Sequence, residues 1–175
     1  MSLGYKLRRA AQILNGLSPR ETRRLDWRCQ AIHNAELDLL ARATTLMDRC
    51  ITGCQGLCCR NTAIDEIIGL TDLVYVLNRA PHLHGRLAAC LVAEAPFFTR
   101  DCPFLDNGHG PCFLPRAVRP EVCITTFCAD TSPIRSETVR LRRAFRQLGW
   151  TLWGLGAKQA MRRFRRIPPE RNRPG

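Results

Sequence analysis

Long apolar runs are missing from this sequence of 175 residues. The longest, which includes Leu87 to Val92, is far shorter than the roughly 20 residues that cross a bilayer. The first residues also lack the apolar stretch of a secretory signal. We therefore expect no membrane span and a cytoplasmic location, where cysteine thiols stay reduced.

Motifs that mark several common enzyme classes are also absent. The sequence contains no phosphate-binding P-loop, no GxGxxG dinucleotide fingerprint, no HExxH metalloprotease motif and no nucleophile elbow. The sequence therefore assigns no catalytic residue, and it leaves open whether the chain is an enzyme.

Acidic residues are scarce, since 15 Asp and Glu stand against 27 Lys and Arg, for a formal net charge of +12. The net charge is +5 over residues 1–30, −3 over 31–132 and +10 over 133–175. A basic C-terminal segment predicts an acidic protein or nucleic acid as partner, and a solvated helix face is the alternative. The predicted anion-binding face consists of Arg142, Arg143, Arg146, Arg162, Arg163 and Arg166.

Cysteine, in contrast, is abundant, with ten residues in the chain. Eight of them form two groups: Cys50, Cys54, Cys58 and Cys59, then Cys102, Cys112, Cys123 and Cys128. Thiolates are the ligands that zinc and iron–sulfur clusters prefer, and short spacings bring them together at little entropic cost. In a reducing compartment this clustering predicts metal binding ahead of disulfides, redox thiols or core packing.

Individual residues near the two groups raise further expectations. Neighbouring side chains diverge, so Cys58 and Cys59 serve two sites, or one of them is a thiol beside the metal. His109 could add a ligand, or it is a solvated turn residue. Arg119 could place a cation beside the thiolates, or it only precedes a helix. Cys29 and Cys90 lie on apolar helical faces with no cysteine near in sequence, so we expect them in the core.

A resemblance to a known family rests on a series of motifs. The pair Cys58-Cys59 is followed by Cys102-Pro-Phe-Leu, Gly110-Pro-Cys112, Arg119-Pro120-Glu-Val-Cys123 and Phe127-Cys128. Over about residues 50–128 this resembles the YkgJ-like cysteine-cluster proteins. The resemblance implies that the eight cysteines chelate zinc or iron, the latter also as an iron–sulfur cluster. The alternatives are a thiol-redox or cluster-dependent modifying enzyme, and a zinc module that binds nucleic acid through its basic segment.

Hydrophobic periodicity predicts most of the helices. Residues 4–16 form a short helix, and a capping box at Ser18 begins a helix of about 30 residues that reaches Cys50. Because Cys50 falls in phase with the buried stripe of that helix, a core role for it stays open beside the ligand role. Shorter helices follow at 71–79, at 82–94 and after Pro120, while 65–70 is either a strand or a helical turn. A hairpin-like loop joins Cys102 to Cys112.

The last long segment, 136–166, is predicted to be a kinked helix or two helices, because Gly149, Gly154 and Gly156 weaken it. The expected fold is a single irregular, mainly α-helical domain around a cysteine-rich metal-binding centre, with at most a short β-hairpin. A basic segment, 1–17, precedes this domain at 18–166, whose Arg-rich helical part is 133–166. Residues 167–175 are expected to be a disordered tail.

Overall fold

The described part of the chain folds mainly into helices. The structure, a computed structural model, describes residues 2–48, 59, 63–92, 102–106, 112–127 and 130–164. Within these ranges the only strand-like pairing is one antiparallel bridge between Leu105 and Cys112. The prediction of a mainly α-helical fold is therefore confirmed. None of the described helices is both long enough and apolar enough to cross a membrane.

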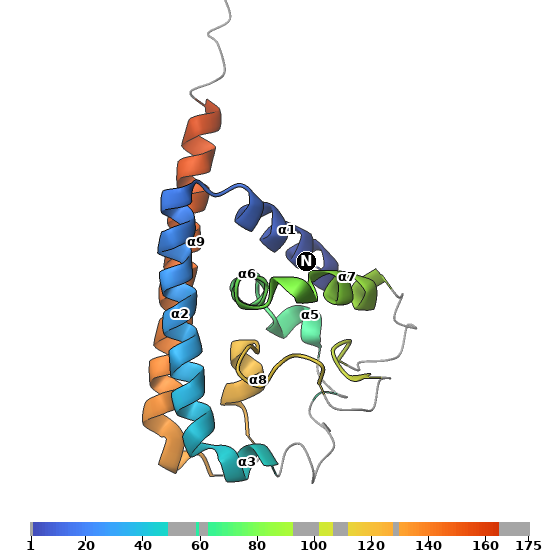
Figure 1. The fold of residues 1–175 in the computed structure, drawn as a ribbon, viewed down its shortest axis with the longest axis vertical. Helices are drawn as coiled ribbons and strands as arrows, with labels where there is room; N and C mark the ends of the chain where they lie inside the picture. Colours follow the sequence, from blue (N-terminus) through green and yellow to red (C-terminus); the bar gives the residue numbers. More distant parts are fainter. Residues whose placement is uncertain are drawn as a thin grey trace, which may run out of the picture.

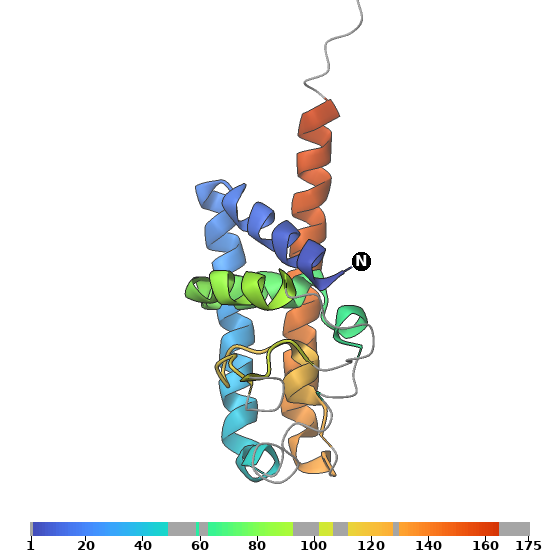
Figure 2. The same ribbon diagram turned by 90° about the vertical axis from the view of Figure 1, so that its right-hand side faces the viewer.

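Two long helices, α2 (Pro19–Arg42) and α9 (Arg135–Phe164), run side by side and form the long axis of the molecule (Figures 1 and 2). Their pairing is antiparallel, because Arg28 contacts Gln147 whereas Asp38 contacts Arg140. The seam between them is fully buried, with Leu25, Ile32 and Leu39 on α2 and Leu141 and Leu148 on α9. Burial of such side chains contributes about 1.5–3 kcal/mol each, so this seam is a major source of stability.

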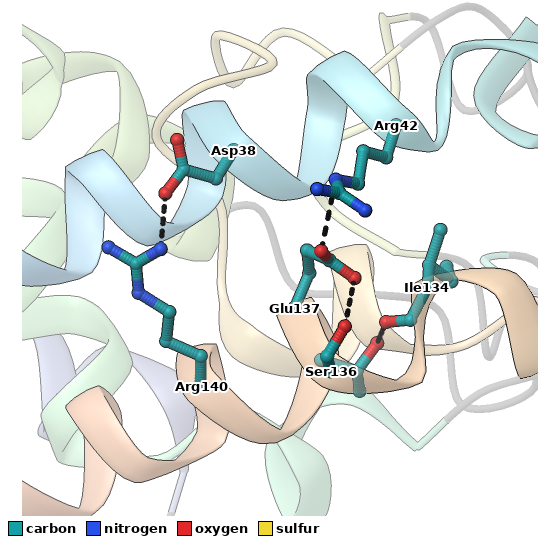
Figure 3. A network of polar contacts seen from close by, with 7 residues as sticks. Asp38, Arg42, Ile134, Ser136, Glu137 and Arg140 are labelled. Atoms are coloured by element: carbon teal, nitrogen blue, oxygen red, sulfur yellow. Dashed lines mark hydrogen bonds and ion pairs between the residues drawn. The ribbon is translucent and has the colours of Figure 1, made fainter.

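Charged contacts line the solvent-facing edge of the seam (Figure 3). Arg140 Nη1 lies 2.6 Å from Asp38 Oδ2, and Arg42 Nε lies 3.0 Å from Glu137 Oε1. Ser136 Oγ donates a hydrogen bond to the same Glu137 carboxylate at 2.8 Å. Because Asp38, Arg42 and Arg140 are at least half exposed, we expect about 1 kcal/mol or less from each pair.

The remaining helices pack on one side of this pair (Figure 1). Helix α1 (Leu3–Asn15) lies against α6 (Leu70–Arg79) and α7 (His84–Val92). Lys6 Nζ of α1 donates a hydrogen bond to Ile68 O at 2.8 Å. Tyr75 of α6 meets Phe145 of α9 edge to face, with ring centroids 5.3 Å apart. Since Leu3 and Leu7 of α1 are buried in the same hydrophobic core, the basic segment 1–17 packs onto the domain.

The start of α2 agrees with the sequence, but its end does not. Ser18 N–H donates to Glu21 Oε2 at 3.0 Å, which confirms the predicted capping box. The expected single helix of about 30 residues is wrong, because α2 ends at Arg42 and a separate α3 (Thr44–Asp48) follows. Thr44 Oγ1 donates to the carbonyl of Leu40 at 3.1 Å, and a hydroxyl that competes for helix carbonyls in this way favours a break.

The C-terminal helix is more continuous than the sequence predicts. We expected a kink or two helices, yet α9 is one continuous helix of 30 residues. Each glycine inside a helix costs about 1 kcal/mol relative to alanine, and burial of the α9 stripe against α2, α6 and α8 (Glu121–Thr125) offsets that cost. Packing on these neighbours therefore keeps the helix straight.

The shorter segments follow the sequence closely. The segment 65–70, predicted to be either a strand or a helical turn, begins in the helical turn α5 (Ile64–Ile67) and ends at the first residue of α6. A 3-10 turn, Pro81–Leu83, precedes α7, and Pro120 lies immediately before α8. The predicted tail, 167–175, falls outside the described residues.

Two positions on the same turn of α9 test the importance of the seam. Leu141→Ala should lower the free energy of unfolding by about 2–5 kcal/mol, because Leu141 is fully buried and a cavity would remain. Val139→Ala is the matched control, since Val139 is 54% exposed and should change stability by about 0.5 kcal/mol or less. Urea denaturation followed by circular dichroism measures both. Equal losses for the two variants would contradict this account of the core.

Candidate metal centre

Four of the predicted ligand cysteines are described, and they come from separate parts of the chain. Cys102 N–H donates a hydrogen bond to Cys59 O at 2.7 Å, so these two segments lie side by side. The bridge between Leu105 and Cys112 then pairs the Cys102 segment with the Cys112 segment. Cys123 lies on α8 and completes the set. The antiparallel approach of the Cys102 and Cys112 segments agrees with the predicted hairpin-like loop, although residues 107–111 of that loop lie outside the described residues.

The thiols of this group are close enough to influence one another's ionisation. The pKa of Cys102 is raised to about 12, mainly by burial and with smaller contributions from the neighbouring Cys59, Cys112 and Cys90. Burial also raises the pKa of Cys123 well above its usual value, with added contributions from Cys102, Cys112 and Cys59. A negative charge on one of these sulfurs therefore makes ionisation of the neighbouring thiols less favourable.

The remaining predicted ligands lie outside the described residues. They are Cys50, Cys54, Cys58, Cys128 and His109. Within the part of the chain that the structure describes, no three His, Cys, Asp or Glu side chains are arranged to hold an ion. Cys29, Cys90, Cys102, Cys112 and Cys123 are free thiols. The described residues thus bring four suitable sulfurs into one region without forming a complete coordination sphere by themselves.

The two cysteines assigned to the core behave differently from each other. Cys29 on α2 is fully buried in the hydrophobic core, as expected. Cys90 on α7 is only half-buried. It also lies close enough to Cys102 to contribute to the raised pKa of that thiol, although no other cysteine is near it in the sequence. Arg86, one turn earlier on α7, pairs with Asp106 and stacks 4.1 Å from the Phe113 ring centroid. This contact brings the hairpin to α7.

Arg119 precedes α8, and its charge acts on the Cys112 thiol. Its guanidinium donates to the carbonyl of Leu114, with Nη2 at 3.3 Å and Nε at 3.4 Å. Burial raises the pKa of Cys112, and the positive charge of Arg119 opposes that rise. Arg119 is therefore positioned to stabilise a thiolate at Cys112.

Glu36 is a functional candidate that the sequence did not identify. In the sequence it is only a polar residue that interrupts the apolar positions of α2. Its side chain is fully buried. Glu36 Oε2 accepts a hydrogen bond from the Tyr75 hydroxyl, and Oε1 accepts one from Arg119 N–H at 3.2 Å. Glu36 therefore ties α2 to α6 and to the segment that precedes Cys123.

Two further groups support the same segment. Ala117 O lies 2.9 Å from His33 Nδ1 and accepts a hydrogen bond from the Tyr75 hydroxyl at 3.3 Å. His33 is half-buried in this contact. The position of Glu36 among apolar residues could have suggested that its side chain is buried. Nothing in the sequence predicted the contact between His33 and Ala117.

Asp72 holds the start of α8. Its carboxylate accepts hydrogen bonds from Gly69 N–H at 2.8 Å and from Glu121 N–H at 2.9 Å. Burial raises its pKa, and these hydrogen bonds oppose the rise. A hollow of about 290 Å³ opens beside it, between α5, α6, α8 and α9, and includes Thr125, Thr126 and Arg142 in its lining. Through Asp72, α6 fixes the helix that carries Cys123.

The predicted anion-binding face is only partly visible. Arg142, Arg143 and Arg146 are exposed on α9, and Arg142 Nε lies 3.6 Å from Glu121 Oε1. Arg162 and Arg163 belong to the last turns of α9, where only the backbone is described, and Arg166 lies outside the described residues.

Comparison with known proteins provides no further assignment, since no family model, no curated protein and no solved structure matches this chain.

The buried carboxyl of Glu36 predicts a pH-dependent stability. Burial raises its pKa from 4.5 to about 8, against the opposing effects of the Tyr75 hydrogen bond and of Arg119, while Asp72 adds to the rise. Because the folded state holds this proton more tightly, the contribution of Glu36 to stability is fully present below about pH 4.5 and is lost as the pH rises to about 8. The slope reaches about 1.4 kcal/mol per pH unit.

Glu36→Gln should remove this contribution. The amide can donate to the Tyr75 oxygen while Tyr75 donates to Ala117 O, so the variant imitates the protonated acid. Subtracting its unfolding free energies from those of the native chain, between pH 4.5 and 9, isolates Glu36 from Asp72 and Glu121, whose pKa values are also raised. Two parallel curves would show that Glu36 does not titrate in this range.

Proposed function

We propose that this chain is a metal-binding protein whose cysteines chelate zinc or iron, the latter also as an iron–sulfur cluster. The observation that carries the proposal is the approach of Cys59, Cys102, Cys112 and Cys123 to one another from separate segments. Thiolates are the donors that these metals prefer. The resemblance to the YkgJ-like proteins supports the same set, extended by Cys50, Cys54, Cys58 and Cys128.

The electrostatics of the group favour a cation at this place. Burial disfavours each thiolate, and a metal ion that replaces the proton removes this disadvantage. Arg119 supplies one positive charge near Cys112, and a metal ion would supply the further positive charge that the other thiolates need. The hydrogen bonds of Glu36 and Asp72 would hold the ligand-bearing segments in place.

The same electrostatics argue against the thiol-redox alternative for these residues. A reactive thiol needs a lowered pKa, whereas the pKa values of Cys102, Cys112 and Cys123 are raised. A cluster-dependent modifying enzyme remains the alternative that the family resemblance suggests. Either function needs reduced cysteines, in accord with a cytoplasmic location.

Metal content provides the direct test. The full chain, purified without oxygen and without added metal, should contain zinc or iron close to stoichiometry by elemental analysis. Iron with broad visible absorption identifies a cluster, and a colourless protein with zinc identifies a zinc site. Metal-free protein whose thiols all react with a thiol reagent would overturn the proposal.

A pair of substitutions assigns the metal to this region. Cys102→Ala should lower the bound metal to less than half, because Cys102 lies at the centre of the group. Cys29→Ala is the matched control, since Cys29 is equally buried but lies in the hydrophobic core, and it should keep the full metal content. Circular dichroism verifies that both variants fold. Equal metal loss in the two variants would contradict the assignment.

A further inference from the structure

The solvent-facing side of α9 carries an unusual combination of side chains. Trp150 and Trp153 are each 72% exposed, although tryptophan is usually well buried. Arg143 and Arg146 precede them at helical spacings of three and four, so all four residues lie along one side of the helix. We call this set the outer stripe of α9. The opposite side carries the buried Leu141 and Leu148.

The two indole rings form an open aromatic surface. Their centroids lie 6.3 Å apart and their planes are nearly perpendicular, at 86°. Trp27, another exposed tryptophan, differs because the Arg28 guanidinium lies 4.5 Å above its ring and covers one face. Each ring of the pair can therefore offer a flat surface to a separate planar group.

The charge of the outer stripe is positive. Glu137 is the only acidic residue of α9, and it is already engaged by Arg42 and Ser136. Among the described residues, neither Arg143 nor Arg146 forms an ion pair, in contrast to Arg140 and Arg142. The charge of Arg146 does act on Glu121, whose pKa it lowers, but no contact of ion-pair length holds it there. An anionic partner would therefore meet two guanidinium groups that no ion pair engages.

We propose that the outer stripe of α9 binds single-stranded nucleic acid. Unpaired bases would stack on Trp150 and Trp153, while Arg143 and Arg146 contact the phosphates. Aromatic platforms beside cationic groups are the recurrent means of binding single strands, because every base has a flat face and every linkage carries a charge. The perpendicular rings suit two bases of an unstacked strand. This function is separate from metal binding and does not depend on it.

Two other anionic partners fit the stripe less well. A membrane-surface helix inserts its apolar side among lipids, but the apolar side of α9 is buried against α2, α6 and α8. An acidic protein would satisfy the arginines and would leave the tryptophan faces without a specific partner. Duplex DNA or RNA offers phosphates, but its bases are already stacked.

Fluorescence anisotropy with labelled single strands of about 16 nucleotides, in DNA and RNA forms, tests the proposal on the full chain. Trp150→Ala and Trp153→Ala should each weaken binding by about tenfold. The double variant Arg143→Gln/Arg146→Gln should weaken binding and lower the slope of log K against log salt by about 1.4, for two phosphate contacts. The DNA and RNA arms together identify which strand is preferred.

Matched controls separate the stripe from overall charge. Trp27→Ala removes an exposed tryptophan elsewhere, and Arg8→Gln/Arg9→Gln removes two exposed charges from α1; both should keep affinity within about twofold of the native chain. Equal losses in stripe and control variants, or equal affinity for a duplex of the same length, would overturn the proposal. Displacement of the strand by anionic phospholipid vesicles or poly-glutamate at equal charge concentration would also overturn it, in favour of a membrane or an acidic protein.

Discussion

Burial of the apolar seam between α2 and α9 is the interaction on which the other elements depend. Both helices are strongly charged on their outer sides, and an isolated helix of this kind gains little stability in water. Packed together, they bury Leu25, Leu39, Leu141 and Leu148. The pair then provides a fixed surface on which α6 and α8 pack, and α1 packs in turn on α6 (Figure 1). Removing the seam would leave the cysteine-bearing segments with no frame.

Two buried carboxyl groups connect that frame to the candidate metal centre. Glu36 belongs to α2 and Asp72 to α6, yet each accepts a backbone N–H from the segment 119–121. A buried carboxyl group is unfavourable unless its oxygens are hydrogen-bonded, and here the partners are the residues just before Cys123. The polar interior therefore serves to position a segment that has little regular structure of its own.

The two proposed functions use different surfaces and different chemistry. The cysteine group is half-buried to buried, and burial there raises the pKa of thiols such as Cys123. The outer stripe of α9 lies at the surface, where exposed rings and guanidinium groups suit a solvated polyanion. Because α9 contributes to the core with one side and to the stripe with the other, one helix connects the frame to both regions.

The sequence by itself determined the helical class, the capping box at Ser18 and the pairing of the Cys102 and Cys112 segments, since each depends on residues close together in the chain. Only the tertiary structure decided that the buried Glu36 accepts a hydrogen bond from the backbone N–H of Arg119 and that Cys90 lies near Cys102, because those contacts join distant segments. It also decided that α9 stays continuous through Gly149, since burial on three neighbouring helices outweighs a local propensity of about 1 kcal/mol.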